Sequence, residues 1–260
     1  MFFLRTAQPG RICRDSRAPR RDRGHVDPSR SLTQRGKPRL PVRHAPPAGP
    51  AEYPLGGIRV ERQRLVDVAR LQAHRARRIP GRQWVARCGV VLLIAERGTA
   101  ADGAPALLMM RRVQRAGDPW SGHVVFPGGR VQADDADTRA AALRELAEET
   151  GLQPDATFRP IGRLSDLLTR EHGRHRPMVV TPYVYRVPGA AALAPTREAA
   201  SLWWQPLPDL LAREHRKRLI WRVAGLPVPV PSIEVGGARL WGLSLMMVNE
   251  LLRAAELKPR

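Results

Sequence analysis

Residues 144–152 of the chain read RELAEETGL, and they follow the glycine pair Gly128-Gly129 after a short loop. The segment 138–150 is rich in Ala and contains Leu at intervals, which favours a helix. Gly151 stands at its end, where a left-handed residue commonly closes a helix. The stretch therefore predicts a helix that begins after a Gly-Gly turn and ends where the chain changes direction.

Three glutamates of this segment share one side of the predicted helix. Glu145, Glu148 and Glu149 fall within about 100° of one another, because residues three and four apart lie on the same face. Such close carboxylates repel one another unless a cation compensates, and Mg²⁺ or Mn²⁺ prefers oxygen ligands. A solvated acidic face is the alternative, but the glycine turn and the neighbouring Arg144 favour a metal site. The residues expected to be buried on the opposite side are Leu143, Leu146, Ala147 and Thr150.

The stretch from Arg144 to Leu152 resembles the second half of the Nudix box, Arg-Glu-apolar-x-Glu-Glu-x-Gly-apolar. In the first half, the loop after Gly129 is one residue longer than usual, and Asp134 or Asp135 stands where Glu is expected. A longer loop with Asp resembles the coenzyme A pyrophosphatase branch of the family. The resemblance implies an α+β fold, a Nudix-type α/β/α sandwich with a mixed sheet.

The resemblance also implies roles for the acidic residues. It assigns Glu145 and Glu149 to metal ligation, with Glu148 as a third ligand or a base, while Arg144 orients its neighbours. A bound Mg²⁺ or Mn²⁺ would neutralise the pyrophosphate and orient a water, whose proton a carboxylate accepts. Glu198 precedes a family-like strand and is a candidate extra ligand or base, with a surface loop residue as the alternative. The expected catalytic residues are Glu148, Glu149 and Glu198.

Residues 122–129, GHVVFPGG, are similar to the signature that precedes the box in coenzyme A pyrophosphatases. His123 replaces the usual Gln of that signature, and Asp118 falls about where the branch carries an Arg. Trp120 is a candidate for stacking on adenine, or it is a structural plug. The expected substrate-binding residues are Arg111, Arg112, Arg115, Trp120, His123, Gly128 and Gly129.

These features predict hydrolysis of a small nucleotide-type substrate. The favoured substrate is coenzyme A or an acyl derivative, which would give 3',5'-ADP and 4'-phosphopantetheine. ADP-ribose, another nucleoside-diphosphate derivative or a dinucleoside polyphosphate is the alternative of the same class. A non-catalytic Nudix-fold binding module is the alternative of another class, and all three helix carboxylates argue against it.

The net charge of +20 is unevenly distributed. Residues 1–50 carry 12 Lys/Arg against 3 Asp/Glu, a net charge of +9, and lack hydrophobic periodicity. We therefore predict a disordered Arg/Pro-rich extension over 1–55, with an organelle transit peptide as the minor alternative. Residues 56–82 are predicted as an amphipathic helix, at about 59–78, and a linker, and residues 83–257 as the Nudix domain. We do not expect nucleic acid to be a partner, except through non-specific contacts of the basic tail.

Within the domain, hydrophobic patterning predicts the remaining elements. Strands are expected at 86–95, 106–110, 124–126, 158–164, 179–187, 202–204 and 219–223, the first two forming a hairpin, and a final helix at 243–255. Cys13 and Cys88 cannot build a disulfide framework, which favours a reducing compartment. No apolar run is long enough to span a bilayer, so we expect a cytoplasmic protein without a membrane partner. A homodimer is left open.

Overall fold

The computed structural model describes residues 67–100, 102–114, 121–171, 176–194, 196–197, 199–223 and 226–257. All of them belong to one compact unit, 57–260. The predicted disordered extension lies outside the described residues, and so does the part of the predicted helix before residue 67. The candidate site residues that also lie outside are Arg115, Asp118, Trp120 and Glu198.

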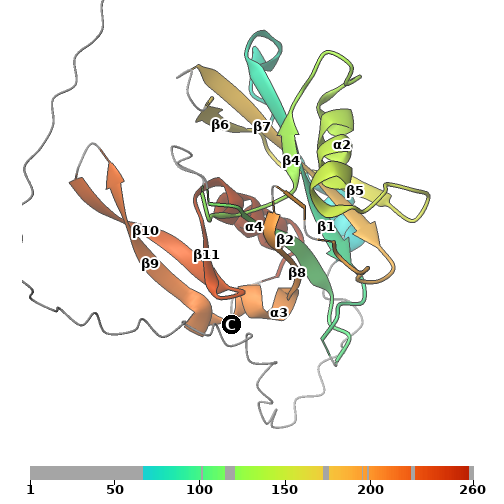
Figure 1. Cartoon of the computed structure of the whole chain (residues 1–260), viewed down its shortest axis with the longest axis vertical. Coiled ribbons are helices and arrows are strands. Elements are labelled where there is room, and N and C mark those ends of the chain that lie inside the picture. The colour runs from blue at the N-terminus through green and yellow to red at the C-terminus, as the bar shows by residue number, and fades with distance from the viewer. Residues whose placement is uncertain are drawn as a thin grey trace, which may run out of the picture. The chain divides into compact units, whose positions relative to one another are not determined.

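In the described part of the chain, eight strands form a sheet whose central path runs β3-β2-β1-β7-β5 (Figure 1). Strand β4 pairs with β1, β6 with β7, and β8 with β2. The pair β1 and β7 is parallel and the others are antiparallel, which confirms the predicted mixed sheet. The strands are β1 (Ala86–Ala95), β2 (Ala106–Arg112), β3 (Val124–Val125), β4 (Gly128–Arg130), β5 (Arg159–Arg163), β6 (Leu167–Arg170), β7 (Pro177–Val187) and β8 (Ala199–Pro206).

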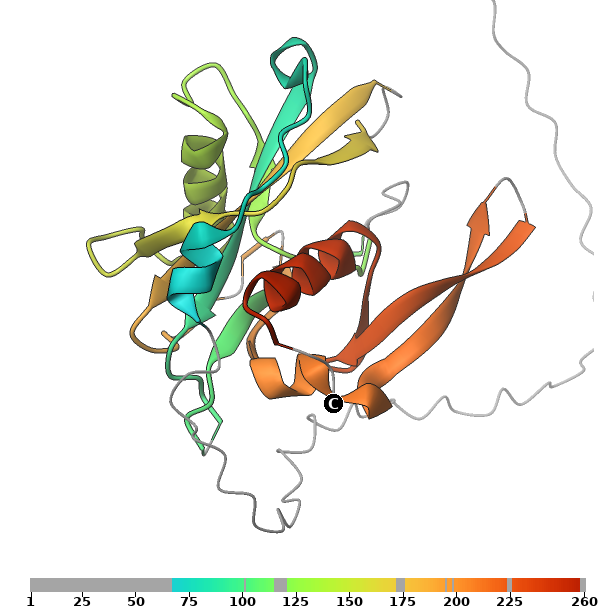
Figure 2. The ribbon, with the colours of Figure 1, turned by 180° about the vertical axis from the view of Figure 1, so that it is seen from behind.

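Strand β1 is apolar throughout its second half because both of its faces are buried. Val91 and Leu93 join the core beneath α2 (Thr138–Thr150), whereas Leu92 and Ile94 join the core beneath α4 (Gly242–Ala254). Successive side chains of a strand point to opposite faces, so the two helices cover opposite sides of the sheet (Figure 2). This arrangement confirms the predicted α/β/α sandwich.

A second sheet of three strands, in the order β11-β10-β9, follows the main sheet in the sequence among the described residues. Its strands are β9 (Arg216–Val223), β10 (Leu226–Val235) and β11 (Ala238–Trp241). The short elements are α1 (Val68–Ala73), α3 (Leu207–Leu211) and the 3₁₀ turns η1 (Arg82–Trp84) and η2 (Arg213–His215). Each predicted strand is present, several with longer bounds, and strands β4, β6, β10 and β11 and helix α3 were not predicted.

The helix predicted to reach residue 78 is wrong at its end, because α1 stops at Ala73. The following residues leave the helical conformation and bind the domain instead. The amide of Ile79 and the guanidinium of Arg82 donate to the Asp166 carboxylate, at 2.9 Å and at 2.8 and 3.0 Å. Thr181 and Arg163 donate to the same carboxylate, whose side chain is fully buried. The segment that was predicted as a linker is thus fixed to the domain by a buried ion-pair network.

No helix of the described residues has the length and apolar composition that crossing a membrane requires.

Candidate active site

The glycine pair forms strand β4, which lies between β1 and helix α2. Gly128 pairs with Val90 and Gly129 pairs with Gly89. A Cβ on Gly128 would lie 2.3 Å from the carbonyl oxygen of Gly89, and the φ of Gly128 is 155°. A Cβ on Gly129 would lie 2.2 Å from the carboxyl group of Glu145. Only glycine lets the backbone approach the strand on one side and the helix carboxylate on the other.

Glu149 is turned toward this strand from the next turn of the helix. The amide of Gly128 donates to Oε2 of Glu149 at 2.9 Å, and only 3% of the glutamate is exposed. The helix therefore does not present its three carboxylates together on an open face, as its periodicity had predicted. Leu146 and Thr150 are buried as expected, but Leu143 and Ala147 are half-buried, and Glu149 is buried with the core side. The amide of Gly128 explains this difference, because it donates a hydrogen bond to the Glu149 carboxylate, which can therefore point inward.

Arg144 holds the residues around the helix in place. Its Nε and Nη2 donate to the two carboxylate oxygens of Asp135, each at 3.0 Å. Its Nη1 donates to Glu145 at 3.0 Å and to Glu148 at 3.1 Å. The hydrogen bonds from the guanidinium lower the pKa of Asp135. The same hydrogen bonds to Asp135, more than those to the two glutamates, raise the pKa of Arg144. Of the two aspartates that the sequence offered for this place, the structure brings Asp135 to Arg144.

Cys88 of β1 lies behind the two inward carboxylates, and the sequence did not point to it. Loss of hydration raises the pKa of its thiol to about 12, and the negative charges of Glu145 and Glu149 add to the increase. Arg130, which pairs with Cys88 across β1 and β4, acts in the opposite direction. The charges of Glu145 and Glu149 on α2 therefore both act on the Cys88 thiol of β1.

The oxygen donors of these residues suit a divalent cation, but they do not form a complete set of ligands around one position. Glu145 and Glu149 offer hard oxygen donors beside Gly128-Gly129, which suits Mg²⁺ or Mn²⁺. Glu148 instead leans toward Arg144, with 57% of its side chain exposed. Among the described residues, no group of three or more His, Cys, Asp or Glu side chains is arranged to hold a metal ion. Two of the three predicted ligands are thus brought together at the glycine strand.

The described candidates for substrate binding lie on the neighbouring strands. Arg111 and Arg112 end β2, and the amide of Arg112 donates to the carbonyl oxygen of His123 at 3.1 Å. The ring of His123 packs edge-on against Trp241, with centroids 4.9 Å apart, and Trp241 contacts Trp221 at 4.4 Å. The structure thus joins His123 to Arg112 and to two tryptophans of the second sheet. Sequence reasoning did not single out Trp221, which carries no local signal for this contact.

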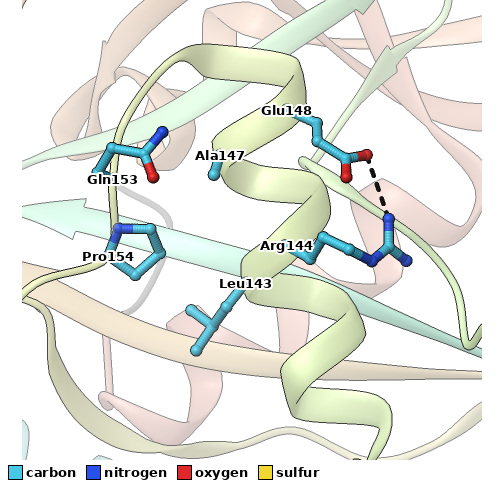
Figure 3. Close-up of a pocket in the computed structure, with 6 residues that line it drawn as sticks. All are labelled: Leu143, Arg144, Ala147, Glu148, Gln153 and Pro154. Carbon is cyan, nitrogen blue, oxygen red and sulfur yellow. Dashed lines mark hydrogen bonds and ion pairs between the residues drawn. The ribbon is translucent and has the colours of Figure 1, made fainter. Parts of the chain in front are cut away.

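A separate hollow of about 530 Å³ lies along the outer side of α2 (Figure 3). Arg144 and Glu148 reach it from the helix, and Gln153 and Pro154 line it from the segment that follows. Its lining includes neither the glycine strand nor the two inward carboxylates, so we do not assign substrate binding to it.

A sequence profile of the NUDIX domain family matches residues 85–222, more than half of the chain. The chain belongs to the Nudix family. This Nudix chain is 28% identical over 154 residues to "Probable nudix hydrolase C6G9.05" of Schizosaccharomyces pombe. The aligned residues cover 59% of this chain and 52% of that protein. The chain is 30% identical over 148 residues to "Uncharacterized Nudix hydrolase NudL" of Yersinia pestis, covering 56% and 71%.

A solved MutT/nudix family protein from Enterococcus faecalis is 18% identical, with a TM-score of 0.43 over 68% of this chain and 62% of that one. The Nudix chain spans only about a third to a half of the length of the fission yeast relatives that it matches.

Proposed function

We propose that the chain is a metal-dependent hydrolase that cleaves a pyrophosphate bond in a nucleotide-type substrate, with coenzyme A or acyl-coenzyme A as the favoured substrate. One observation carries the proposal. Glu145 contacts the strand at Gly129 while Glu149 accepts a hydrogen bond from the amide of Gly128. The two carboxylates thus lie close together at the glycine strand, where they can hold a cation that binds a phosphate group.

Nudix hydrolases generally use divalent metal ions. Here Glu145 and Glu149 would hold Mg²⁺ or Mn²⁺, with Glu148 as a further ligand or as the base that accepts a proton from water. A bound cation supplies charge neutralisation at the phosphate oxygens and lowers the pKa of a bound water. Arg144 orients Glu145 and Glu148, since one nitrogen of its guanidinium binds both. Glu198 stays a proposal for an extra ligand or base.

The preference for coenzyme A rests on the loop and on the preceding signature. Asp135 lies in the loop whose extra residue resembles the coenzyme A pyrophosphatase branch, and its carboxylate accepts two hydrogen bonds from Arg144. Arg111 and Arg112 lie at the end of β2, which pairs with β1 as the glycine strand also does, and they supply cations for a 3'-phosphate. The products of this reaction are 3',5'-ADP and 4'-phosphopantetheine.

The full chain should be incubated with coenzyme A, ADP-ribose, NADH and diadenosine polyphosphates, with Mg²⁺ or Mn²⁺, and products separated by chromatography. We expect the highest kcat/KM with coenzyme A. Glu149→Gln should lower kcat/KM by a factor on the order of 100 or more, because it removes a charge that binds the cation. Glu214→Gln, an exposed glutamate on η2, is the matched control and should leave kcat/KM unchanged.

The outcomes separate the alternatives. Turnover of ADP-ribose but not of coenzyme A would reject the substrate and keep the reaction type. No turnover of any compound would favour a non-catalytic binding module. Titration calorimetry with Mn²⁺ gives a readout without turnover, because wild type and Glu214→Gln should bind the cation more tightly than Glu149→Gln.

A further inference from the structure

The exposed apolar side chains of the described chain gather on the outer part of β9 and β10. We name this part, residues 219–223 and 226–231, the arm. Strand β11 pairs with β10 only from Ser232 onward, so β9 and β10 pair with each other alone along the arm (Figure 2). Seven large hydrophobic residues are exposed among the described residues, and four of them lie on the arm. These are Ile220, Trp221, Leu226 and Val228.

The two faces of the arm differ in chemistry. Residues paired across two strands share a face, and so do residues two apart. Leu219 pairs with Val230, and Trp221 pairs with Val228. The apolar face therefore consists of Leu219, Trp221, Leu226, Val228 and Val230. The opposite face carries Arg218 and Ile220, together with Pro229 and Pro231.

The apolar face is ordered but incompletely covered. Trp221 packs against Trp241, yet 36% of it is exposed, and Val228 and Leu226 are 37% and 69% exposed. A two-stranded ribbon with water on both sides is marginally stable, because it buries little apolar surface. Exposed apolar patches of this kind commonly mark association sites. The arm thus needs a cover over Leu226 and Val228.

A further strand cannot provide this cover at the free edge of β10. Pro227, Pro229 and Pro231 stand at alternate positions, and proline has no N–H to donate. Because β10 stays paired with β9, these three positions face the free edge and offer carbonyl groups only. The free edge of β9 begins with Arg216, Lys217 and Arg218, which repel the same strand of a second copy. Association must therefore use a face of the arm and not an edge.

We propose that the apolar face packs against the same face of a second copy around a two-fold axis, so that the chain forms a homodimer. A two-fold contact needs a surface that is complementary to itself. The apolar face meets this condition, because Arg218 lies on the opposite side and Lys217, the nearest charged residue on the same side, stands opposite Ser232 at the base of the arm. Leu219, Trp221, Leu226, Val228 and Val230 themselves offer no charge that would select an acidic or basic partner.

The proposal also predicts the strength and salt dependence of the dimer. Only Trp221, Leu226 and Val228 of the apolar face are more than a third exposed, whereas a standard interface buries roughly 800 Å² per partner, so we expect a dimer that dissociates in the micromolar range. The net charge of +20 makes two copies repel each other. Added salt screens this repulsion and strengthens apolar contacts, so the dimer should tighten as salt is raised.

Sedimentation velocity of the full chain over a range of concentrations, at low and high salt, tests the proposal. Wild type should shift from monomer to dimer, whereas Val228→Asp should raise the dissociation constant by roughly tenfold or more. The control is Ile220→Asp, an equally drastic change on the opposite face of the same arm, and it should leave the dissociation constant near that of wild type. Circular dichroism melts of both variants check that the exposed substitutions leave the fold intact.

Three results would overturn the proposal. Wild type could stay monomeric throughout, the two variants could weaken the dimer equally, or salt could weaken the dimer. An increase in KM for Val228→Asp, without a change in mass, would assign the apolar face to the substrate instead. The sedimentation measurements do not depend on turnover, so they remain informative if the proposed hydrolase activity fails.

Discussion

Arg144 and Asp135 form a two-point ion pair, in which Nε and Nη2 of the arginine each donate to a separate carboxylate oxygen at 3.0 Å. Asp135 lies in the loop before α2 and Arg144 lies within the helix, so the pair fixes the loop to the helix. The third guanidinium nitrogen is thereby directed to Glu145 and Glu148. Charge and geometry at the candidate site thus depend on a residue outside the helix.

Asp135→Asn should reduce activity without unfolding the chain. The amide keeps one acceptor, so the guanidinium loses its two-point support and Glu145 and Glu148 become less well placed. We expect kcat to fall about tenfold and KM to change little, measured with the best substrate of the panel. Asp134→Asn, on the neighbouring exposed residue, should behave as wild type. Equal losses in the two variants would contradict the role of the ion pair.

Gly129→Ala should displace Glu145. The added Cβ would lie 2.2 Å from the carboxyl group, whose side chain must move away from the strand. We expect a loss of Mn²⁺ affinity in titration calorimetry and a fall in kcat of about tenfold or more. In Gly162→Ala the nearest atom is 3.5 Å from the new Cβ, so this control should be tolerated. Unchanged Mn²⁺ affinity in Gly129→Ala would contradict the placement of Glu145.

Asp166→Ala should destabilise the whole domain. The change removes the acceptor of Ile79, Arg82 and Thr181 and leaves buried donors unpaired. Breaking one partner of a buried ion pair costs about 3–5 kcal/mol, and urea denaturation would measure the loss. Asp134→Ala, an exposed aspartate, should change the free energy of unfolding by less than about 0.5 kcal/mol. A similar small change in Asp166→Ala would show that the network does not support the fold.

Cys88 should be unreactive in the folded chain. Its pKa is raised from 9.0 to about 12, so its thiolate is about a thousandfold rarer at pH 8 than in an ordinary thiol. In a Cys13→Ser background, iodoacetamide should alkylate it far more slowly than in urea, as mass spectrometry can follow. Because the folded pKa is the higher one, the neutral thiol stabilises the fold fully below pH 9. This contribution is lost as the pH rises toward 12.

The same thiol reports on the carboxylates. Glu149→Gln removes a negative charge that raises the pKa of Cys88, so alkylation should become faster in that variant. Glu214→Gln should leave the rate unchanged. A rate that is the same in all three chains would mean that the charge of Glu149 does not act on Cys88.

Local signals in the sequence were sufficient for the central elements. The apolar run of β1 and the Ala-rich segment of α2, with its stop at Gly151, predicted their bounds. In the structure Asp137 caps the helix start, and Gly151 closes its end in the left-handed region. Strand β10 was not predicted, because three alternating prolines argue against a strand. They are compatible with β10 only because its outer edge is free, a property of the sheet and not of the segment.

The candidate site was predictable in composition but not in arrangement. Helical periodicity placed Glu145, Glu148 and Glu149 on one side, yet the amide of Gly128 draws Glu149 into the core. Cys88 and Trp221 reach their neighbours through strand pairing and sheet packing, which no local pattern encodes. The choice between Asp134 and Asp135 likewise required the position of Arg144.

The hydrogen bonds to the buried carboxylate of Asp166 show that the folded domain begins before the first residue that the family profile matches. The family profile begins at residue 85, but Ile79 and Arg82 donate to this carboxylate from before the matched region, in addition to Arg163 and Thr181 within it. A recombinant fragment that starts at residue 85 would keep every candidate catalytic residue, but the buried carboxylate would lose the donors of Ile79 and Arg82 and keep those of Arg163 and Thr181. Such a fragment should unfold at a lower urea concentration than the full chain, because the few residues that bind this carboxylate from outside the family match are missing.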